Sequence, residues 1–220
     1  MQVQPATSRT FNLGGLQLDL RATVIVVAST LLLMVDYYHR FLPGDTFSAM
    51  ARAKAIERVI YYLAIPLLII VAGFRDKPSD YGFTFGDWRQ GLKWTGLILL
   101  IAAPVLALAS RSPAILEYYS RFPSDLSQLI PTAFLDLIGW EFIFRGFLLF
   151  GLARLMGPTA VVVQAVPFAL AHLGKPELET LSTIFGGTLF GWVAWRSRSF
   201  VYPFLIHWFI YTFVVLVAHA

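Results

Sequence analysis

The sequence has no cysteine, and only 14% of its 220 residues carry a charge. Without cysteine, the chain forms no disulfide, no thiolate metal site and no cysteine nucleophile. Hydrophobic residues make up 57% of the sequence, too large a share for a soluble domain of this length with so few charges. The composition therefore predicts an integral membrane protein that has the lipid bilayer as a partner.

Dense basic clusters are also missing, although the formal net charge is +4. An excess of Lys and Arg is usual in the loops that orient membrane proteins, whereas nucleic-acid binding needs a concentrated basic surface. We therefore expect no nucleic-acid partner.

Apolar runs follow one another along the chain and are separated by polar connectors that contain Pro and Gly. Their bounds are Ala22–Val35, Val59–Phe74, Leu92–Ala109, Leu126–Leu155, Thr159–Leu173, Leu181–Trp195 and Phe200–Ala218. An upright membrane helix needs about 20 apolar residues, so the shorter runs indicate tilted helices or helices inside a bundle. The pattern predicts an all-α fold, a polytopic transmembrane bundle of about seven helices. With no repeat or second domain in the sequence, we expect residues 1–220 to form a single integral membrane domain.

Two charged residues, Glu141 and Arg145, lie within the fourth of these runs. An ionisable group at bilayer depth costs about 2.5 to 3.5 kcal/mol on insertion scales, so charges retained there indicate a functional centre. Residues four apart share one face of an α-helix, where a carboxylate and a guanidinium neutralise each other. The simpler interpretation is a structural ion pair that only locks helix packing.

Two histidines, His172 and His207, occupy hydrophobic positions on two other predicted helices. Taken alone, each is more typical of a hydrogen-bonded interhelical residue than of a catalyst. Together with Glu141 they supply the base and the oxyanion-stabilising donors that hydrolysis needs. The same three side chains are also a ligand set that Zn²⁺ accepts, although the H-E-x-x-H spacing is absent. The cofactor prediction is therefore open: none, or a divalent metal such as zinc held by His172, His207 and Glu141.

The order of these motifs resembles that of the CPBP family of intramembrane proteases, which includes CAAX prenyl proteases and bacteriocin-processing and immunity proteins. The family motifs are Glu-Glu-x-x-x-Arg, Phe-x-x-x-His and His-x-x-x-Asn or a similar residue. Glu141 and Arg145 match the second Glu and the Arg of the first motif. Phe168 and His172 match the second motif, and His207 matches the His of the third. The resemblance implies that these side chains form one hydrolytic site.

The resemblance covers residues 126–218, which we expect to be the motif-bearing, protease-like core. Two positions depart from the pattern. Trp140 stands where the family has the first Glu, generally regarded as the water-activating base, and Tyr211 stands where it has Asn. Tyr211 retains a hydrogen-bond donor one helical turn from His207. Glu141 is the expected base, and Glu179, which follows the second motif, is the second candidate.

The resulting hypothesis is an intramembrane endopeptidase that hydrolyses a peptide bond in a membrane-associated protein or peptide. Arg145 would orient Glu141, and the two histidines would stabilise the oxyanion or bind a metal. One alternative is a catalytically silent peptide-binding or immunity protein of the same fold, which Trp140 favours. A proton-coupled transporter is a third, although the sequence lacks two inverted halves. Because residues 1–20 show no removable signal peptide, we expect a multi-pass protein of a prokaryotic inner membrane.

Overall fold

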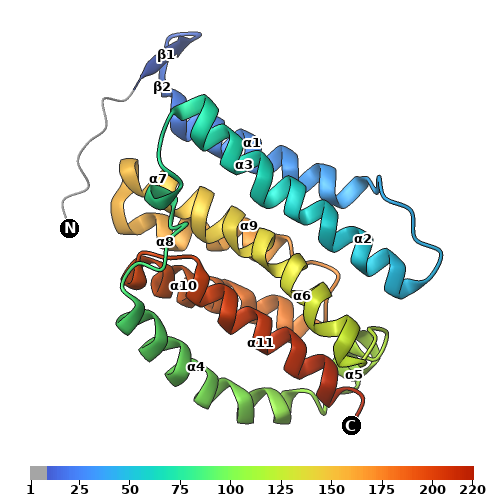
Figure 1. The fold of residues 1–220 in the computed structure, drawn as a ribbon. Helices are drawn as coiled ribbons and strands as arrows, with labels where there is room; N and C mark the ends of the chain where they lie inside the picture. Colours follow the sequence, from blue (N-terminus) through green and yellow to red (C-terminus); the bar gives the residue numbers. More distant parts are fainter. Residues whose placement is uncertain (1–8) are drawn as a thin grey trace.

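The computed structural model describes residues 9–220 and consists almost wholly of helices (Figure 1). The polar stretch 1–20, in which no removable signal peptide is expected, lies partly outside the described residues. The symbol η denotes a π-helical or 3-10-helical segment. The elements are β1 (Thr10–Leu13), β2 (Leu16–Asp19), α1 (Leu20–Tyr38), α2 (Phe47–Val59), η1 (Ile60–Ala64), α3 (Ile65–Leu68), η2 (Ile69–Phe74), η3 (Pro78–Tyr81), α4 (Trp88–Ala109), α5 (Pro113–Tyr119), α6 (Leu126–Glu141), η4 (Phe142–Leu148), α7 (Leu149–Met156), η5 (Gly157–Thr159), α8 (Ala160–Val163), α9 (Ala165–Leu170), α10 (Glu177–Ser197) and α11 (Val201–Val217).

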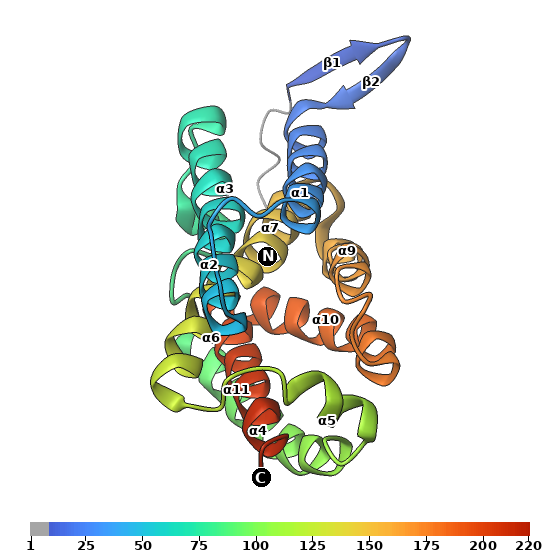
Figure 2. The same cartoon turned by 90° about the vertical axis from the view of Figure 1, so that its right-hand side faces the viewer.

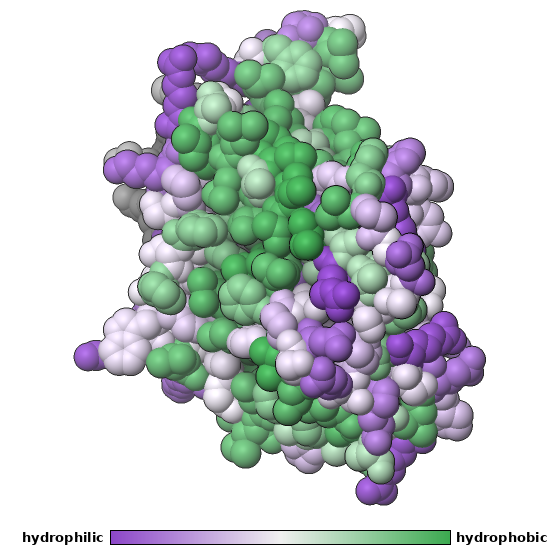
Figure 3. Space-filling model, turned by 45° about the vertical axis from the view of Figure 1, so that its right-hand side comes forward, coloured by the Kyte–Doolittle hydropathy of each residue, from purple (hydrophilic) through white to green (hydrophobic). Residues whose placement is uncertain are grey.

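Several of these helices are long and apolar enough to cross a membrane. The continuous stretches that meet this condition are Leu20–Tyr38, Phe47–Phe74, Trp88–Ala109 and Leu126–Leu170, and Val201–Val217 is a shorter apolar helix. Large hydrophobic side chains on their outer faces are exposed, as lipid contact requires, and a broad hydrophobic band covers the face in Figure 3. The prediction of an all-α, polytopic membrane helix bundle is confirmed.

The second membrane helix begins earlier than the sequence analysis predicts. The predicted run Val59–Phe74 is the apolar half of a 28-residue helix that starts at Phe47, after the capping side chain of Thr46. Its polar half carries Lys54 and Arg58, charges that hydropathy alone assigns to a loop. Lys54 pairs with Asp36 of α1, and Arg58 pairs with Asp36 and with Asp136 of α6, so the chain stays helical through this segment.

A small β-hairpin precedes α1, where the sequence analysis predicts no strand. Strands β1 and β2 are antiparallel, with Leu13 opposite Leu16. The two residues between them, Gly14 and Gly15, have φ values of 57° and 90°. A two-residue loop with positive φ at both positions favours glycine and matches the twist of a tight hairpin. The hairpin and the C-terminal residue lie at opposite ends of the bundle (Figures 1 and 2).

The later helices surround a common interior. Helix α2 packs along α6, α11 packs against both α4 and α6, and α10 packs against α9. Figure 2 shows α10 between α9 and α11. Segment η4 is buried over its whole length and contributes the aromatic side chains Phe142, Phe144 and Phe147 to the main core. The predicted site residues therefore lie on these helices or, for His172, directly after one of them.

Candidate active site

Glu141 and Arg145 form a fully buried ion pair where α6 continues into η4. Arg145 Nη1 donates to Glu141 Oε1 at 3.3 Å, and Arg145 Nε lies 3.3 Å from Glu141 Oε2. The residues after Glu141 are π-helical, a departure from α-helical geometry that is frequent at functional sites. Two opposite charges fixed next to each other avoid the cost of a single buried charge.

The guanidinium of Arg145 is held by two further groups. Its Cζ atom lies 3.9 Å from the ring centroid of Phe168, and its Nη2 atom donates to the carbonyl oxygen of Gly187 at 3.4 Å. Gln164 donates to the same carbonyl at 2.8 Å. A Cβ atom at Gly187 would lie 2.7 Å from Phe168, so only glycine allows this close approach. Gln164 and Gly187 therefore belong to the support of Arg145, and the sequence analysis missed this role.

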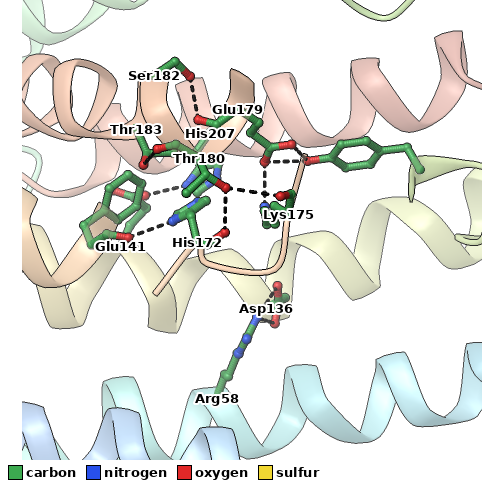
Figure 4. A network of polar contacts seen from close by, with 12 residues as sticks. Arg58, Asp136, Glu141, His172, Lys175, Glu179, Thr180, Ser182, Thr183 and His207 are labelled. Carbon is green, nitrogen blue, oxygen red and sulfur yellow. Dashed lines mark hydrogen bonds and ion pairs between the residues drawn. The ribbon is translucent and has the colours of Figure 1, made fainter. Parts of the chain in front are cut away.

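His207, on α11, is bonded to the same carboxylate. Its Nδ1 atom lies 2.6 Å from Glu141 Oε1, and the dashed line in Figure 4 marks this contact. An ionised carboxylate only accepts hydrogen bonds, so His207 carries a proton on Nδ1. In the neutral imidazole, Nε2 is then left as an acceptor.

His172 follows α9 and has an equivalent arrangement. Its Nδ1 atom lies 2.7 Å from the carbonyl oxygen of Phe168, which accepts the Nδ1 proton. The His172 ring packs on the Phe168 ring at 4.4 Å and edge-on to the Trp140 ring at 5.7 Å, measured between centroids. The His172 and His207 rings are 6.4 Å apart and nearly parallel, with an interplanar angle of 24°. Both imidazoles therefore have an Nε2 acceptor available when neutral.

The remaining two sequence candidates, Glu179 and Tyr211, make no direct hydrogen bond to either histidine in the described chain. Tyr119 donates to both carboxylate oxygens of Glu179, at 2.7 and 2.8 Å, and Lys175 donates to one of them at 2.8 Å (Figure 4). Burial raises the pKa of the Tyr119 hydroxyl well above its usual range, and the Glu179 carboxylate raises it further. Tyr119 thus remains a donor to Glu179 at neutral pH.

Trp140 stands beside a second ion pair that the sequence analysis missed. Arg58 donates to both oxygens of Asp136, at 2.9 and 3.1 Å, and its Cζ atom lies 4.5 Å from the Trp140 ring centroid. Asp136 precedes Trp140 by four residues and so shares its helix face. The four-residue spacing of Asp136 and Trp140 could be recognised in the sequence. The pairing with Arg58 could not, because Arg58 comes from a distant segment.

Two cavities meet at the histidines. A polar cavity of 340 Å³ lies between α2, α6 and the loop after α9, and a mostly apolar cavity of 530 Å³ lies between α4, α10 and α11. Four residues line both: His172, Lys175, His207 and Tyr211. Glu141 lines neither cavity, and Glu179 lines only the apolar one. The structure thus brings the imidazoles to the junction and leaves Glu141 behind His207.

The possible zinc ligand set His172, His207 and Glu141 does not fit a metal site here. Within residues 9–220, no group of three or more His, Asp or Glu side chains is arranged to hold a metal ion. Glu141 occupies the Nδ1 side of His207, so it cannot share a metal with the Nε2 side that faces the cavities. The chemistry available at this junction is therefore that of the side chains themselves.

Comparison with known proteins agrees with the motif order. Residues 122–213 match the type II CAAX prenyl endopeptidase Rce1-like family. This match contains every motif residue described above, from Glu141 to Tyr211, and confirms the resemblance to the CPBP proteases. It supports a membrane-embedded protease of the CAAX type. No curated protein and no solved structure matches the chain.

Proposed function

We propose that the protein is an intramembrane endopeptidase that hydrolyses a peptide bond in a membrane-associated protein or peptide. The observation that carries the proposal is the position of His172 and His207, parallel and 6.4 Å apart, at the junction of a polar and an apolar cavity. A membrane-associated chain has both a water-facing and a lipid-facing part, and such a junction accommodates both.

The two Nε2 acceptors bind the attacking water in this proposal. This requires the two Nε2 atoms to lie within about 5.6 Å of each other, so that one water can donate a hydrogen bond of about 2.8 Å to each. The centroids of the two rings are 6.4 Å apart. That water would donate one hydrogen bond to each imidazole and keep a lone pair for attack on the peptide carbonyl carbon. Its oxygen is therefore oriented before the reaction begins.

His207 is the general base. It removes a proton from the water while the oxygen attacks the carbonyl carbon, and a tetrahedral oxyanion forms. Glu141 stabilises the resulting imidazolium through Nδ1, and Arg145 holds Glu141 in place. When the C–N bond breaks, the imidazolium returns the proton to the leaving amine. This assignment gives Glu141 a positioning role and replaces the expectation that it activates water directly.

The oxyanion needs a donor at the same junction. Tyr211 follows His207 by four residues on α11, lines both cavities, and makes no hydrogen bond with another described residue. Its free hydroxyl is therefore the proposed donor. Glu179 acts indirectly, because it binds the ammonium group of Lys175, the second donor at the junction and a cationic one.

A cleavage assay in lipid vesicles tests the proposal. The probes are two quenched-fluorescent peptides, a prenylated CAAX-type peptide and a transmembrane peptide without a prenyl group. We expect the purified wild type to cleave at least one of them, and His207→Ala to reduce the rate by about 10²- to 10⁴-fold. His172→Asn retains a donor for the Phe168 carbonyl but has no Nε2, and it should lose activity as well. Activity unchanged in both variants would eliminate this site.

A catalytically silent, peptide-binding or immunity function is the second candidate. Trp140 favours it, because an indole stands in the place of the carboxylate that the family uses as base. A silent protein would bind the same peptides with equal affinity in the wild type and in His207→Ala, and neither would cleave them.

We further propose that residues 1–220 form one integral membrane domain, with 126–218 as its protease-like core, in a prokaryotic inner membrane. Fluorescence of a tagged protein in fractionated bacterial membranes tests this location.

A further inference from the structure

An apolar cluster lies between the polar and the apolar cavity. Its buried members are Ile115 and Tyr119 of α5, Leu129 of α6, and Val214 and Val215 of α11. Leu129 lines the polar cavity, whereas Ile115 and Tyr119 line the apolar one. Because one packed cluster contributes to the walls of both cavities, it acts as a partition between them.

Three aromatic rings bring this partition up to the histidines. Tyr119 lines the apolar cavity, Phe122 lines the polar cavity, and Tyr211 lines both. The ring centroids of Tyr119 and Phe122 are 6.0 Å apart, those of Phe122 and Tyr211 are 5.7 Å apart, and those of Tyr119 and Tyr211 are 6.1 Å apart. These separations are typical of aromatic pairs in contact, so each ring packs against the other two. We call this group the aromatic triangle.

The aromatic triangle is held by contacts with other helices. Tyr119 donates to both carboxylate oxygens of Glu179 on α10, at 2.7 and 2.8 Å. Phe47, at the start of α2, packs edge-on against Phe122, with 5.2 Å between the ring centroids. Figure 2 shows α5 beside α11 and the start of α10. Contacts from α2, α10 and α11 therefore fix the position of the three rings.

The lining that the two cavities share is confined to one place. Among the described residues, only His172, Lys175, His207 and Tyr211 line both cavities. A peptide that occupies both cavities therefore crosses beside the histidines, with the aromatic triangle next to it. One residue of an extended chain spans about 3.3 Å, so a crossing point with fixed walls distinguishes one peptide bond from its neighbours.

We propose that the aromatic triangle determines which peptide bond is cut. It holds the boundary between the hydrophilic and the hydrophobic part of the substrate at the two histidines, so the bond at that boundary meets the reacting water. The inference rests on the proposed function and adds a substrate class to it: peptides that change abruptly from hydrophilic to hydrophobic sequence. Tyr119 and Phe122 determine specificity and take no part in the chemistry. Tyr211 contributes its ring to the triangle in addition to its proposed hydroxyl donor.

The masses of the cleavage products test this role. The prenylated and the transmembrane probe peptides are incubated in lipid vesicles with each variant. We expect the wild type to cut one bond and Phe122→Ala to cut neighbouring bonds as well, because loss of the ring leaves space in the wall. Tyr211→Phe keeps its ring and should keep the single cut at a reduced rate. Phe209→Ala removes an exposed ring of α11 that lines neither cavity, and this matched control should also keep the single cut.

Thiol labelling tests the partition without hydrolysis. The chain has no cysteine, so Thr183→Cys places a single thiol on the wall of the apolar cavity. The hydrogen bond of the Thr183 hydroxyl, to the carbonyl oxygen of Thr180 at 2.6 Å, lies within α10, so the substitution breaks no bond between helices. A negatively charged methanethiosulfonate reagent enters from water through the polar cavity. We expect it to label this thiol about tenfold faster when Phe122→Ala is also present, because the wall is then open.

Phe122→Leu keeps much of the apolar volume but has no ring, so it decides the question if Phe122→Ala does not fold. Extra cuts and faster labelling in a folded variant without the ring support the inference. A single cut in that variant, equally fast labelling with and without the ring, or scattered cuts by the wild type would overturn it and leave the hydrolytic proposal standing. If the wild type cleaves neither probe peptide, the hydrolytic proposal fails and bond selection fails with it, while the labelling rates still show whether the triangle separates the cavities.

Discussion

The Nδ1 atom of His207 lies 2.6 Å from the Oε1 atom of Glu141, and this contact joins α11 to α6 inside the protein. It fixes the orientation of the imidazole and directs the opposite nitrogen away from the carboxylate. The cavities are lined by His207 and not by Glu141, so in the proposed mechanism the carboxylate acts through the histidine. The same contact also satisfies a buried charge, so stability and chemistry must be separated by experiment.

Glu141→Gln should lower hydrolysis by about 10²- to 10⁴-fold with little change in KM, because the amide cannot stabilise a His207 imidazolium. It should also destabilise the fold by about 3 to 5 kcal/mol, since Arg145 is left as a buried, unpaired charge. The double variant Glu141→Gln, Arg145→Met removes both charges and should recover much of the stability but none of the activity. Thermal unfolding and peptide cleavage are measured on the same samples. Recovery of activity along with stability would show that the pair is only structural.

Trp140→Glu should raise the hydrolytic rate. The centroid of the Trp140 ring lies 4.5 Å from the Arg58 guanidinium carbon and 5.7 Å from the centroid of the His172 ring. A carboxylate at position 140 would therefore have a cationic partner and would lie beside the proposed water. We expect an increase of at least about tenfold, since a well-placed acid–base group contributes about 10²- to 10⁴-fold. Trp140→Gln is the uncharged control. If the Glu and Gln variants cleave at the same rate, the position has no access to the reacting water.

Gly187→Ala should destabilise the protein by about 1 to 3 kcal/mol, because the new methyl group would lie 2.7 Å from the Phe168 ring on which Arg145 rests. At the neighbouring Gly186, a methyl group would have no other atom within 4 Å, so Gly186→Ala is a matched control. It should be neutral or slightly stabilising, because alanine favours a helix over glycine by up to about 1 kcal/mol. Midpoints of thermal denaturation compare the two variants. Equal midpoints would contradict the tight packing described for Gly187.

Tyr119 should make stability depend on alkaline pH. Burial first, and then the Glu179 carboxylate, raises the pKa of its hydroxyl in the folded protein. Because this pKa is higher in the folded than in the unfolded protein, the protonated Tyr119 hydroxyl contributes its full stabilisation below the unfolded-state pKa of about 10. As the pH rises above that value, this contribution is lost by at most about 1.4 kcal/mol per pH unit. Tyr119→Phe should therefore flatten the decline in unfolding temperature between pH 10 and higher values. Tyr118→Phe, one residue away, is the control, and an identical decline in both variants would contradict the prediction.

Much of the fold follows from the apolar runs and the polar connectors between them. The apolar runs identify the membrane helices because burial in lipid requires both a hydrophobic surface and internally satisfied backbone groups. Hydropathy does not predict the start of α2, because the charges of Lys54 and Arg58 are neutralised by partners that are distant in the sequence. It also does not indicate the hairpin, whose short strands depend on the loop at Gly14 and Gly15.

The candidate site is predictable in its residues but not in its roles. Glu141, Arg145, His172 and His207 stand out because polar groups are costly in apolar helices. Which side of His207 faces Glu141 depends on the relative rotation of α6 and α11, and no local pattern encodes that rotation. For the same reason, Arg58 and Asp136 are recognised as a pair only after α2 packs along α6.

The junction of the two cavities at His172 and His207 has a consequence for the products. In the proposed reaction, a substrate cut at that point would have its hydrophilic fragment in the polar cavity and its hydrophobic fragment in the apolar cavity. Each fragment would then leave the junction through a different cavity. Their different solubilities would keep the two new ends apart after the cut.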